Sequence, residues 1–119
     1  MKLTLLTLLA ATVAAISLAA VAQSAPNAQT VRVTASSYSF KLSAKPKAGV
    51  VKFVIRNAAK SDGHDIWIRG GGKTFKSRPL GPNGTATVTA TLRKGVKYSF
   101  WCSIGSHAKK GMRGSFVAG

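Results

Sequence analysis

The sequence predicts an all-β fold, a small β-sandwich or barrel. From Thr30 onward, apolar and polar residues alternate with a period of two, and no long segment has the 3.6-residue period of an amphipathic helix. Glycine-rich turns separate the alternating segments. Six or seven short strands joined by such turns, in fewer than about 100 residues, are typical of a sandwich or barrel.

The alternating segments define the expected strands in chain order. Val31 and Val33 alternate with polar residues in the first segment, and Phe53 and Ile55 do so in the third. The segment 85–92 has a threonine at every second position, as expected of a half-buried strand. The expected strands are residues 30–34, 37–42, 51–56, 64–69, 85–92, 96–102 and 112–118.

Turn residues lie between these strands. Turns are predicted at 45–49, which contains a proline and a glycine, and at 93–95, which ends in a glycine. The segment 70–84 is rich in glycine and contains two prolines. We expect that segment to be a loop or an irregular sheet edge.

The first 22 residues predict a secretory signal peptide. Lys2 gives the start a positive charge, residues 3–21 are almost wholly apolar or small, and Ala-Val-Ala at 20–22 fits a small-x-small cleavage site. An uncleaved anchor is the alternative, because the apolar segment is nearly long enough to span a bilayer. Cleavage would leave residues 23–29 as a flexible leader and residues 30–119 as one domain. We expect that domain to be exported to the periplasm, the cell envelope or the medium, without stable membrane insertion.

The chain is strongly basic. Eighteen lysines and arginines stand against two acids, Asp62 and Asp65, for a formal net charge of +16. The basic residues are scattered, so most should form a solubilising surface, and their sum favours acidic partners or anionic surfaces. Sequence motifs that read DNA or RNA are absent, so no specific nucleic-acid partner is expected. Both acids flank His64, where we expect them to have a local role.

The single cysteine, Cys102, needs a specific explanation in an exported chain. Exported thiols normally pair, and this one has no partner in its own chain. Metal ligation in a shielded site is one explanation and an intermolecular disulfide is another. His107 follows five positions later and Met112 ten positions later, and His64 is the other histidine of the chain. Thiolate, imidazole and thioether suit copper better than hard cations.

These residues therefore predict one metal site that uses the cysteine, both histidines and one methionine. The alternative is a buried cysteine, a surface histidine and a core methionine that lie near each other by chance. Zinc tolerates the same ligand types. A methionine and a single thiolate nevertheless fit copper better.

The C-terminal half contains several motifs in order. Leu-Gly-Pro-Asn-Gly at 80–84 precedes the threonine-rich strand, residues 95–102 end in Trp-Cys, and Gly-Met-Arg-Gly at 111–114 follows the histidine. Val-Ile-Arg-Asn at 54–57 and Gly-His-Asp-Ile at 63–66 precede them. Together these motifs resemble the cupredoxins, the plastocyanin–azurin family of small blue-copper proteins, over residues 30–119. The resemblance implies a Greek-key β-sandwich or barrel of about seven strands.

The resemblance also implies a role for each ligand of a type 1 copper site. His64, Cys102 and His107 would form a close trigonal set, with Met112 as a long axial ligand that tunes the redox potential. The carbonyl of Gly63 would approach from the opposite axial side, as in the azurin branch, although an ordinary turn glycine is the alternative.

One residue departs from the family pattern. The residue after the first histidine is often asparagine in the family, and here it is Asp65. Its carboxylate can accept hydrogen bonds from the region of Ser103 and so tie the two ligand loops together. It also places a negative charge near the metal.

The resemblance implies an exported electron carrier, not an enzyme, that cycles one copper between Cu(I) and Cu(II). Multicopper oxidases and copper nitrite reductases need further histidines for a second copper centre, and both histidines are already assigned here. A copper carrier or buffer without redox partners is the first alternative. A cationic polyanion-binding protein with an incidental cysteine is the second. We expect a monomer.

The ligand loop also predicts where electrons leave. The imidazole edge of His107 should reach the surface while Cys102 stays covered. Apolar residues of the loop should surround that edge, and basic residues should form its rim, which favours a redox partner with an acidic docking surface. The apolar residues are Ile104 and Ala108, and the basic residues are Lys109, Lys110 and Arg113.

Overall fold

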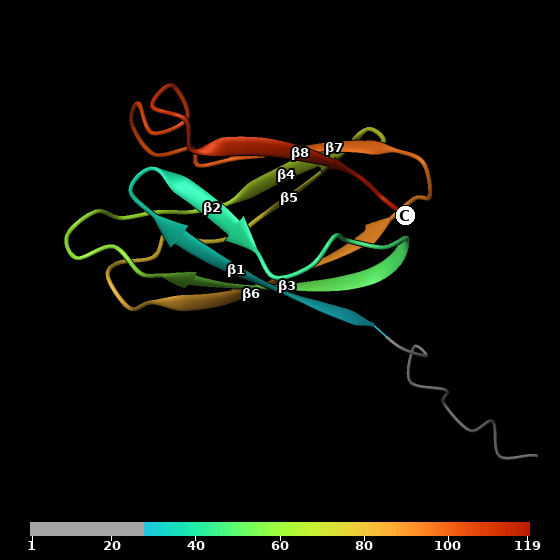
Figure 1. The fold of residues 1–119 in the computed structure, drawn as a ribbon, viewed down its shortest axis with the longest axis horizontal. Helices are drawn as coiled ribbons and strands as arrows, with labels where there is room; N and C mark the ends of the chain where they lie inside the picture. Colours follow the sequence, from blue (N-terminus) through green and yellow to red (C-terminus); the bar gives the residue numbers. More distant parts are fainter. Residues whose placement is uncertain (1–27) are drawn as a thin grey trace, which may run out of the picture.

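The computed structural model describes residues 28–119, which form two four-stranded sheets packed face to face (Figure 1). The first sheet has the order β2-β1-β3-β6 and the second has the order β5-β4-β7-β8. The prediction of an all-β sandwich is confirmed. The described part has eight strands where about seven were predicted: β1 (Gln29–Ser36), β2 (Ser39–Leu42), β3 (Gly49–Asn57), β4 (Trp67–Gly70), β5 (Lys73–Lys76), β6 (Thr85–Leu92), β7 (Lys97–Trp101) and β8 (Arg113–Val117).

The strand pairing makes the chain change sheets three times. β1 pairs in parallel with β3, and all the other neighbouring strands pair antiparallel. The chain crosses between the sheets after β3, after β5 and after β6. The crossover from β3 to β4 is long and irregular, and it carries His64.

The extra strand is β5, a regular strand at the edge of its sheet, and it corrects the prediction of a loop or an irregular sheet edge over residues 70–84. β5 pairs with β4 through a turn at Gly71 and Gly72, whose φ angles are 57° and 75°. Two consecutive positive φ values define the tight hairpin turn that glycine favours. The glycines that indicated a loop therefore close a hairpin.

The strand predicted at 64–69 begins later than expected. Regular pairing starts at Trp67, and His64 instead forms an isolated bridge with Leu80. Two backbone hydrogen bonds, of 3.0 and 2.8 Å, make up that bridge. The bridge fixes the backbone of His64 although the residue lies outside a regular strand.

The core lies between the two sheets. The inward residues of β1, β3 and β6 alternate with exposed or half-buried ones, as the period of two predicts. Aromatic side chains of the second sheet fill the space opposite, and Tyr98 lies 5.5 Å from Phe116 between ring centroids. Gly114 makes room for one of these rings, because a Cβ there would lie 2.5 Å from Cζ of Phe100.

Three connections meet at one end of the sandwich, on the left in Figure 1. They are the β1–β2 turn, the β3–β4 crossover and the β7–β8 loop, and hydrogen bonds between them are described below. No helix within residues 28–119 is long and apolar enough to cross a membrane. The predicted signal peptide (1–22) and most of the leader (23–29) lie outside the described residues, and β1 already begins at Gln29.

Candidate metal centre

His64 lies in the β3–β4 crossover. Its side chain is completely buried, and its backbone is fixed by the bridge to Leu80. Asn57, at the end of β3, supports the same segment because its amide nitrogen donates to the carbonyls of Asp62 and Leu80, at 2.8 and 2.9 Å. The crossover is therefore rigidly tied although it has no regular pairing of its own.

The other two donors, the sulfur of Cys102 and an imidazole nitrogen of His107, come from the β7–β8 loop. Cys102 directly follows β7 and is 1% exposed. Successive turns bring His107 back over it, with the N–H of His107 donating to the carbonyl of Ile104 at 3.1 Å. Gly111 has a φ of 109°, which only glycine adopts readily, and it directs the chain back into β8.

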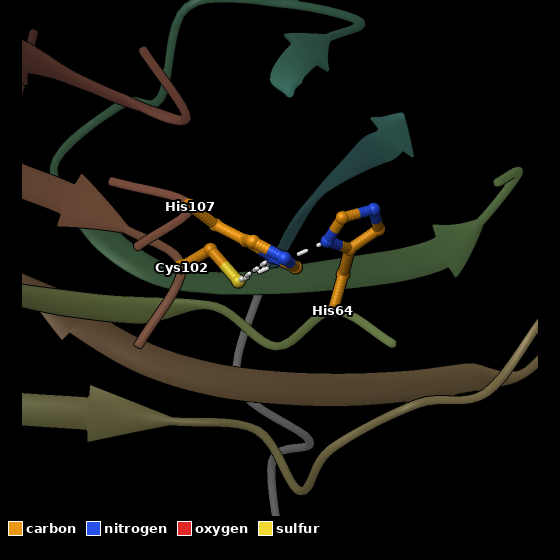
Figure 2. A group of neighbouring side chains, drawn as sticks. All are labelled: His64, Cys102 and His107. Atoms are coloured by element: carbon orange, nitrogen blue, oxygen red, sulfur yellow. Dashed lines mark hydrogen bonds between the residues drawn. The ribbon is translucent and has the colours of Figure 1, made fainter. Parts of the chain in front are cut away.

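Three donor atoms from these two segments converge, as Figure 2 shows. The sulfur of Cys102 lies 3.6 Å from Nδ1 of His107 and 3.9 Å from Nδ1 of His64. The three donor atoms all lie within 4.8 Å of one another. Donors bound to one ion at about 2.0 to 2.3 Å lie roughly 3.5 to 3.7 Å apart when the ligand–metal–ligand angle is about 120°. The two sulfur–nitrogen separations are close to this range, so Cys102 and the two histidines could surround one ion.

Backbone hydrogen bonds tie Met112 to both ligands of this loop. It is completely buried, its N–H donates to the carbonyl of His107, and its carbonyl accepts from the N–H of Cys102, both at 3.1 Å. These two bonds close the β7–β8 loop and hold the backbones of Cys102, His107 and Met112 close together. The donor set of two imidazoles, one thiol and one thioether is consistent with a type 1 copper site.

The burial of the site favours neutral groups in the protein without metal. Burial raises the pKa of the Cys102 thiol. Burial, with the nearby His107 adding to the effect, lowers the pKa of the His64 imidazole. A metal that binds sulfur must therefore displace the thiol proton, and the binding of the cation offsets the cost of forming the buried thiolate.

Asp65 ties the two ligand segments together, as the sequence predicts. Its carboxylate accepts the backbone N–H of Ser103 at 2.7 Å and the hydroxyl of Ser103 at 2.5 Å. The indole N–H of Trp67 donates to the same carboxylate at 3.2 Å. Asp65 is 3% exposed, and these three donors offset the cost of burying its carboxylate.

The β1–β2 turn supplies contacts that the sequence did not predict. The hydroxyl of Ser37 lies 3.1 Å from Nε2 of His64 and 2.5 Å from a carboxylate oxygen of Asp62. The hydrogen bond from Ser37 lowers the pKa of Asp62. Asp62 was singled out in the sequence because it lies two residues before His64, whereas nothing in the sequence distinguished Ser37 from other turn serines.

Tyr38, from the same turn, covers the second histidine. Its ring centroid lies 4.9 Å from that of His107. The ammonium of Lys110 lies 4.5 Å from the centre of the Tyr38 ring and 3.4 Å from its hydroxyl. His107 is half-buried under this cover, whereas His64 is fully buried.

The remaining residues singled out in the sequence lie around the ligand loop. Ile104 and Ala108 are half-buried, and Lys109, Lys110 and Arg113 are exposed. Gly63 is half-buried, and a Cβ added there would meet Leu80 O and Ile104 Cδ1 at 3.7 and 3.8 Å, which are ordinary contacts. Close packing therefore does not require glycine at 63.

The comparisons with known proteins support the fold. No family model matches the chain, and no curated protein matches it. Among solved structures, dithionite-reduced auracyanin from the photosynthetic bacterium Roseiflexus castenholzii has a TM-score of 0.65 at 19% identity, over 78% of this chain and 99% of its own. Auracyanin B has a TM-score of 0.66 at 18% identity, over 77% of this chain and 89% of its own. At this identity the likeness shows the fold, which is the cupredoxin fold.

Proposed function

We propose that the protein is an exported type 1 copper protein that carries single electrons between redox partners and is not an enzyme. The observation that carries this proposal is the convergence of His64, Cys102 and His107 within 4.8 Å, in a cupredoxin fold. His64, Cys102 and His107 would hold copper as close ligands, and Met112 would be the weak axial ligand. The Gly63 carbonyl is a candidate for the opposite axial position. Bound copper supplies a one-electron couple.

The protein's own contribution is a site that is rigid and dry. His64, Cys102 and Met112 are essentially inaccessible to water. Backbone hydrogen bonds and the Asp65–Ser103 contact fix the ligands from both sides. Because the ligands are held in place, little has to move when the metal gains or loses an electron.

The direct test is to add Cu(II) to the purified protein and to record its visible and EPR spectra. We expect an intense blue band from thiolate-to-copper charge transfer at a stoichiometry of one copper per chain. The Cys102→Ser variant should lose the band. Ser106→Ala, in the same loop but exposed, is the control and should keep it. A colourless wild-type complex under oxidising conditions would contradict the type 1 assignment.

A second measurement separates an electron carrier from a copper carrier or buffer. Reversible voltammetry and fast electron exchange with a redox protein would support the electron carrier. Rapid transfer of copper to an acceptor chelator would favour the copper carrier. The burial of the sulfur donor supports slow metal exchange and therefore the first function.

The proposal includes export and a basic docking surface around His107. Cys102 is 1% exposed, and a thiol in an oxidising compartment is normally expected to have a disulfide partner. Metal ligation would give this thiol a function in such a compartment. His107 is the more accessible histidine, and exposed Lys109 and Arg113 lie near it in the chain. An acidic partner would approach this end of the sandwich. Export is tested separately, because N-terminal sequencing of the exported protein would show whether cleavage occurs after Ala22.

A further inference from the structure

Both acids of this very basic chain lie within two residues of His64, and each accepts a hydrogen bond from a serine hydroxyl. Asp65 bonds to the cysteine loop, as described above. Asp62 is directed elsewhere, to Ser37 in the β1–β2 turn. The role of this second pair follows from the hydrogen bonds that each group can donate or accept.

Ser37 has one proton to donate and lies between two partners. Its hydroxyl oxygen is 2.5 Å from the Asp62 carboxylate and 3.1 Å from Nε2 of His64. An ionised carboxylate only accepts, so the serine proton goes to Asp62. The hydroxyl oxygen can then only accept from His64, and Nε2 must carry the imidazole proton.

This assignment leaves the other nitrogen of the ring unprotonated. Nδ1 of His64 is the atom that faces the sulfur of Cys102, at 3.9 Å. A metal ligand must offer a free lone pair, and Nδ1 offers it in this tautomer. The turn therefore selects the tautomer that can bind a metal.

We propose that Ser37 and Asp62 are positioning residues that hold His64 with its proton on Nε2 and that, through this chain of hydrogen bonds, favour the more highly charged oxidation state of the metal. A histidine ligand whose other N–H is bonded to an acceptor is oriented and made more basic. A carboxylate at the end of the chain adds a negative charge close to the ring. Both effects stabilise the oxidised metal more than the reduced metal. The first half of the proposal depends on the hydrogen bonds alone, and the second half rests on the proposed function.

The test of the first half uses NMR of the metal-free protein. The ¹⁵N shifts of His64 report its tautomer, and the exchange rate of its Nε2 proton reports the contact with Ser37. We expect the Nε2–H tautomer in the wild type. Proton exchange should be at least tenfold faster in Ser37→Ala. Ser37→Thr, which restores a hydroxyl, should recover slow exchange.

The controls separate the pair from its surroundings. Ser61→Ala removes an exposed hydroxyl next to Asp62 and should change nothing. Asp62→Asn should also speed exchange, and it covers the case in which Ser37→Ala does not fold. An Nδ1–H tautomer in the wild type, or equal exchange rates in the wild type and both variants, would overturn the proposal.

The second half is tested by the redox potential of the copper-loaded protein. Ser37→Ala and Asp62→Asn should each raise the potential, and the double variant should raise it by less than the sum because Asp62 acts through Ser37. A tenfold change in the ratio of Cu(II) affinity to Cu(I) affinity shifts the reduction potential by about 59 mV. Unchanged or strictly additive potentials would overturn this half. A colourless wild type with a slowly exchanging Nε2 proton would support the positioning role and contradict the copper function.

Discussion

The carboxylate of Asp65 accepts both the backbone N–H and the hydroxyl of Ser103, at 2.7 and 2.5 Å, and so joins the residue after His64 to the residue after Cys102. The two residues are 38 positions apart in the chain. This contact fixes the separation of the two ligand segments.

Replacing Asp65 with alanine should therefore destabilise the metal-free protein. Three hydrogen bonds to this buried carboxylate are lost, and a hydrogen bond to a charged group contributes about 1.5 to 3 kcal/mol. We expect the free energy of unfolding, measured in urea, to fall by roughly 2 to 4 kcal/mol. Ser115→Ala, on the exposed face of β8, should stay within about 0.5 kcal/mol of the wild type. Equal losses in the two variants would show that the contact contributes nothing specific.

Copper should stabilise the folded protein strongly. A metal that binds only the folded state adds RT ln(1 + [L]/Kd), about 4 kcal/mol at a thousandfold excess over Kd. For a domain of this size that corresponds to a rise in Tm of roughly 15 to 30 °C. Thermal melts followed by circular dichroism, with and without copper, measure the shift. Superimposable melting curves would mean that the site is weak or wrongly assigned.

Met112 should set the potential and not the colour. Met112→Gln replaces a soft thioether with a harder oxygen, which favours Cu(II), so the blue band should remain while the potential falls. Met112→Leu keeps a similar volume in this fully buried position but removes the axial donor, and the potential should rise. Voltammetry of the three proteins checks the order. The same potential in all three would exclude Met112 as an axial ligand.

The sequence predicted the sandwich because its period of two reflects one buried face. Val33 and Phe53 lie inward on β1 and β3, as the alternation requires. The sequence did not predict β5, because this four-residue segment has lysine at both ends and a single apolar residue, Phe75, which is too little to show alternation. That strand depends on the Gly71–Gly72 turn and on pairing with β4.

The ligand set could be predicted for a different reason. Cysteine and histidine are rare in this chain, so their spacing carries information, and Asp65 was identified by its place beside His64. Ser37 and Tyr38 lie 26 residues or more before the histidines they contact (64 − 38 = 26). Serine and tyrosine are also common in strands and turns. Only the folded chain shows that the β1–β2 turn belongs to the site.

Glycine should be required at position 70, because the ring of Tyr98 lies directly against the backbone of β4 there. A Cβ at this position would lie 2.5 Å from Cδ1 of Tyr98 and 2.6 Å from the carbonyl of Lys97, so the backbone would have to shift. We expect Gly70→Ala to lower the free energy of unfolding by about 1 to 3 kcal/mol, as overpacking does. Gly81→Ala, where nothing lies within 4 Å, is the matched control. If both variants unfold like the wild type, the contact with Tyr98 is not tight.

Reversing the charge at Lys109 and Lys110 should slow electron exchange with an acidic partner. Both side chains are exposed on the loop that carries His107, although the ammonium of Lys110 also lies over the Tyr38 ring. If the basic rim steers docking, the Lys109→Glu/Lys110→Glu protein should exchange electrons more slowly at low ionic strength. The difference should shrink as salt screens the charges, because the Debye length falls to about 8 Å at 0.15 M.

The matched control reverses the same number of charges at the opposite end of the sandwich. Lys45 and Lys47 are exposed in the β2–β3 connection, which is hydrogen-bonded to the C-terminal Gly119 and lies away from the ligand loop. Lys45→Glu/Lys47→Glu has the same net charge as the rim variant, so a general charge effect would slow both equally. Stopped-flow rates over a range of salt concentrations separate the two cases, and the copper spectrum should be unchanged in both. Equal rates and equal salt dependence in the two variants would rule out a docking surface around His107, because steering by a local patch requires the position of the charge to matter.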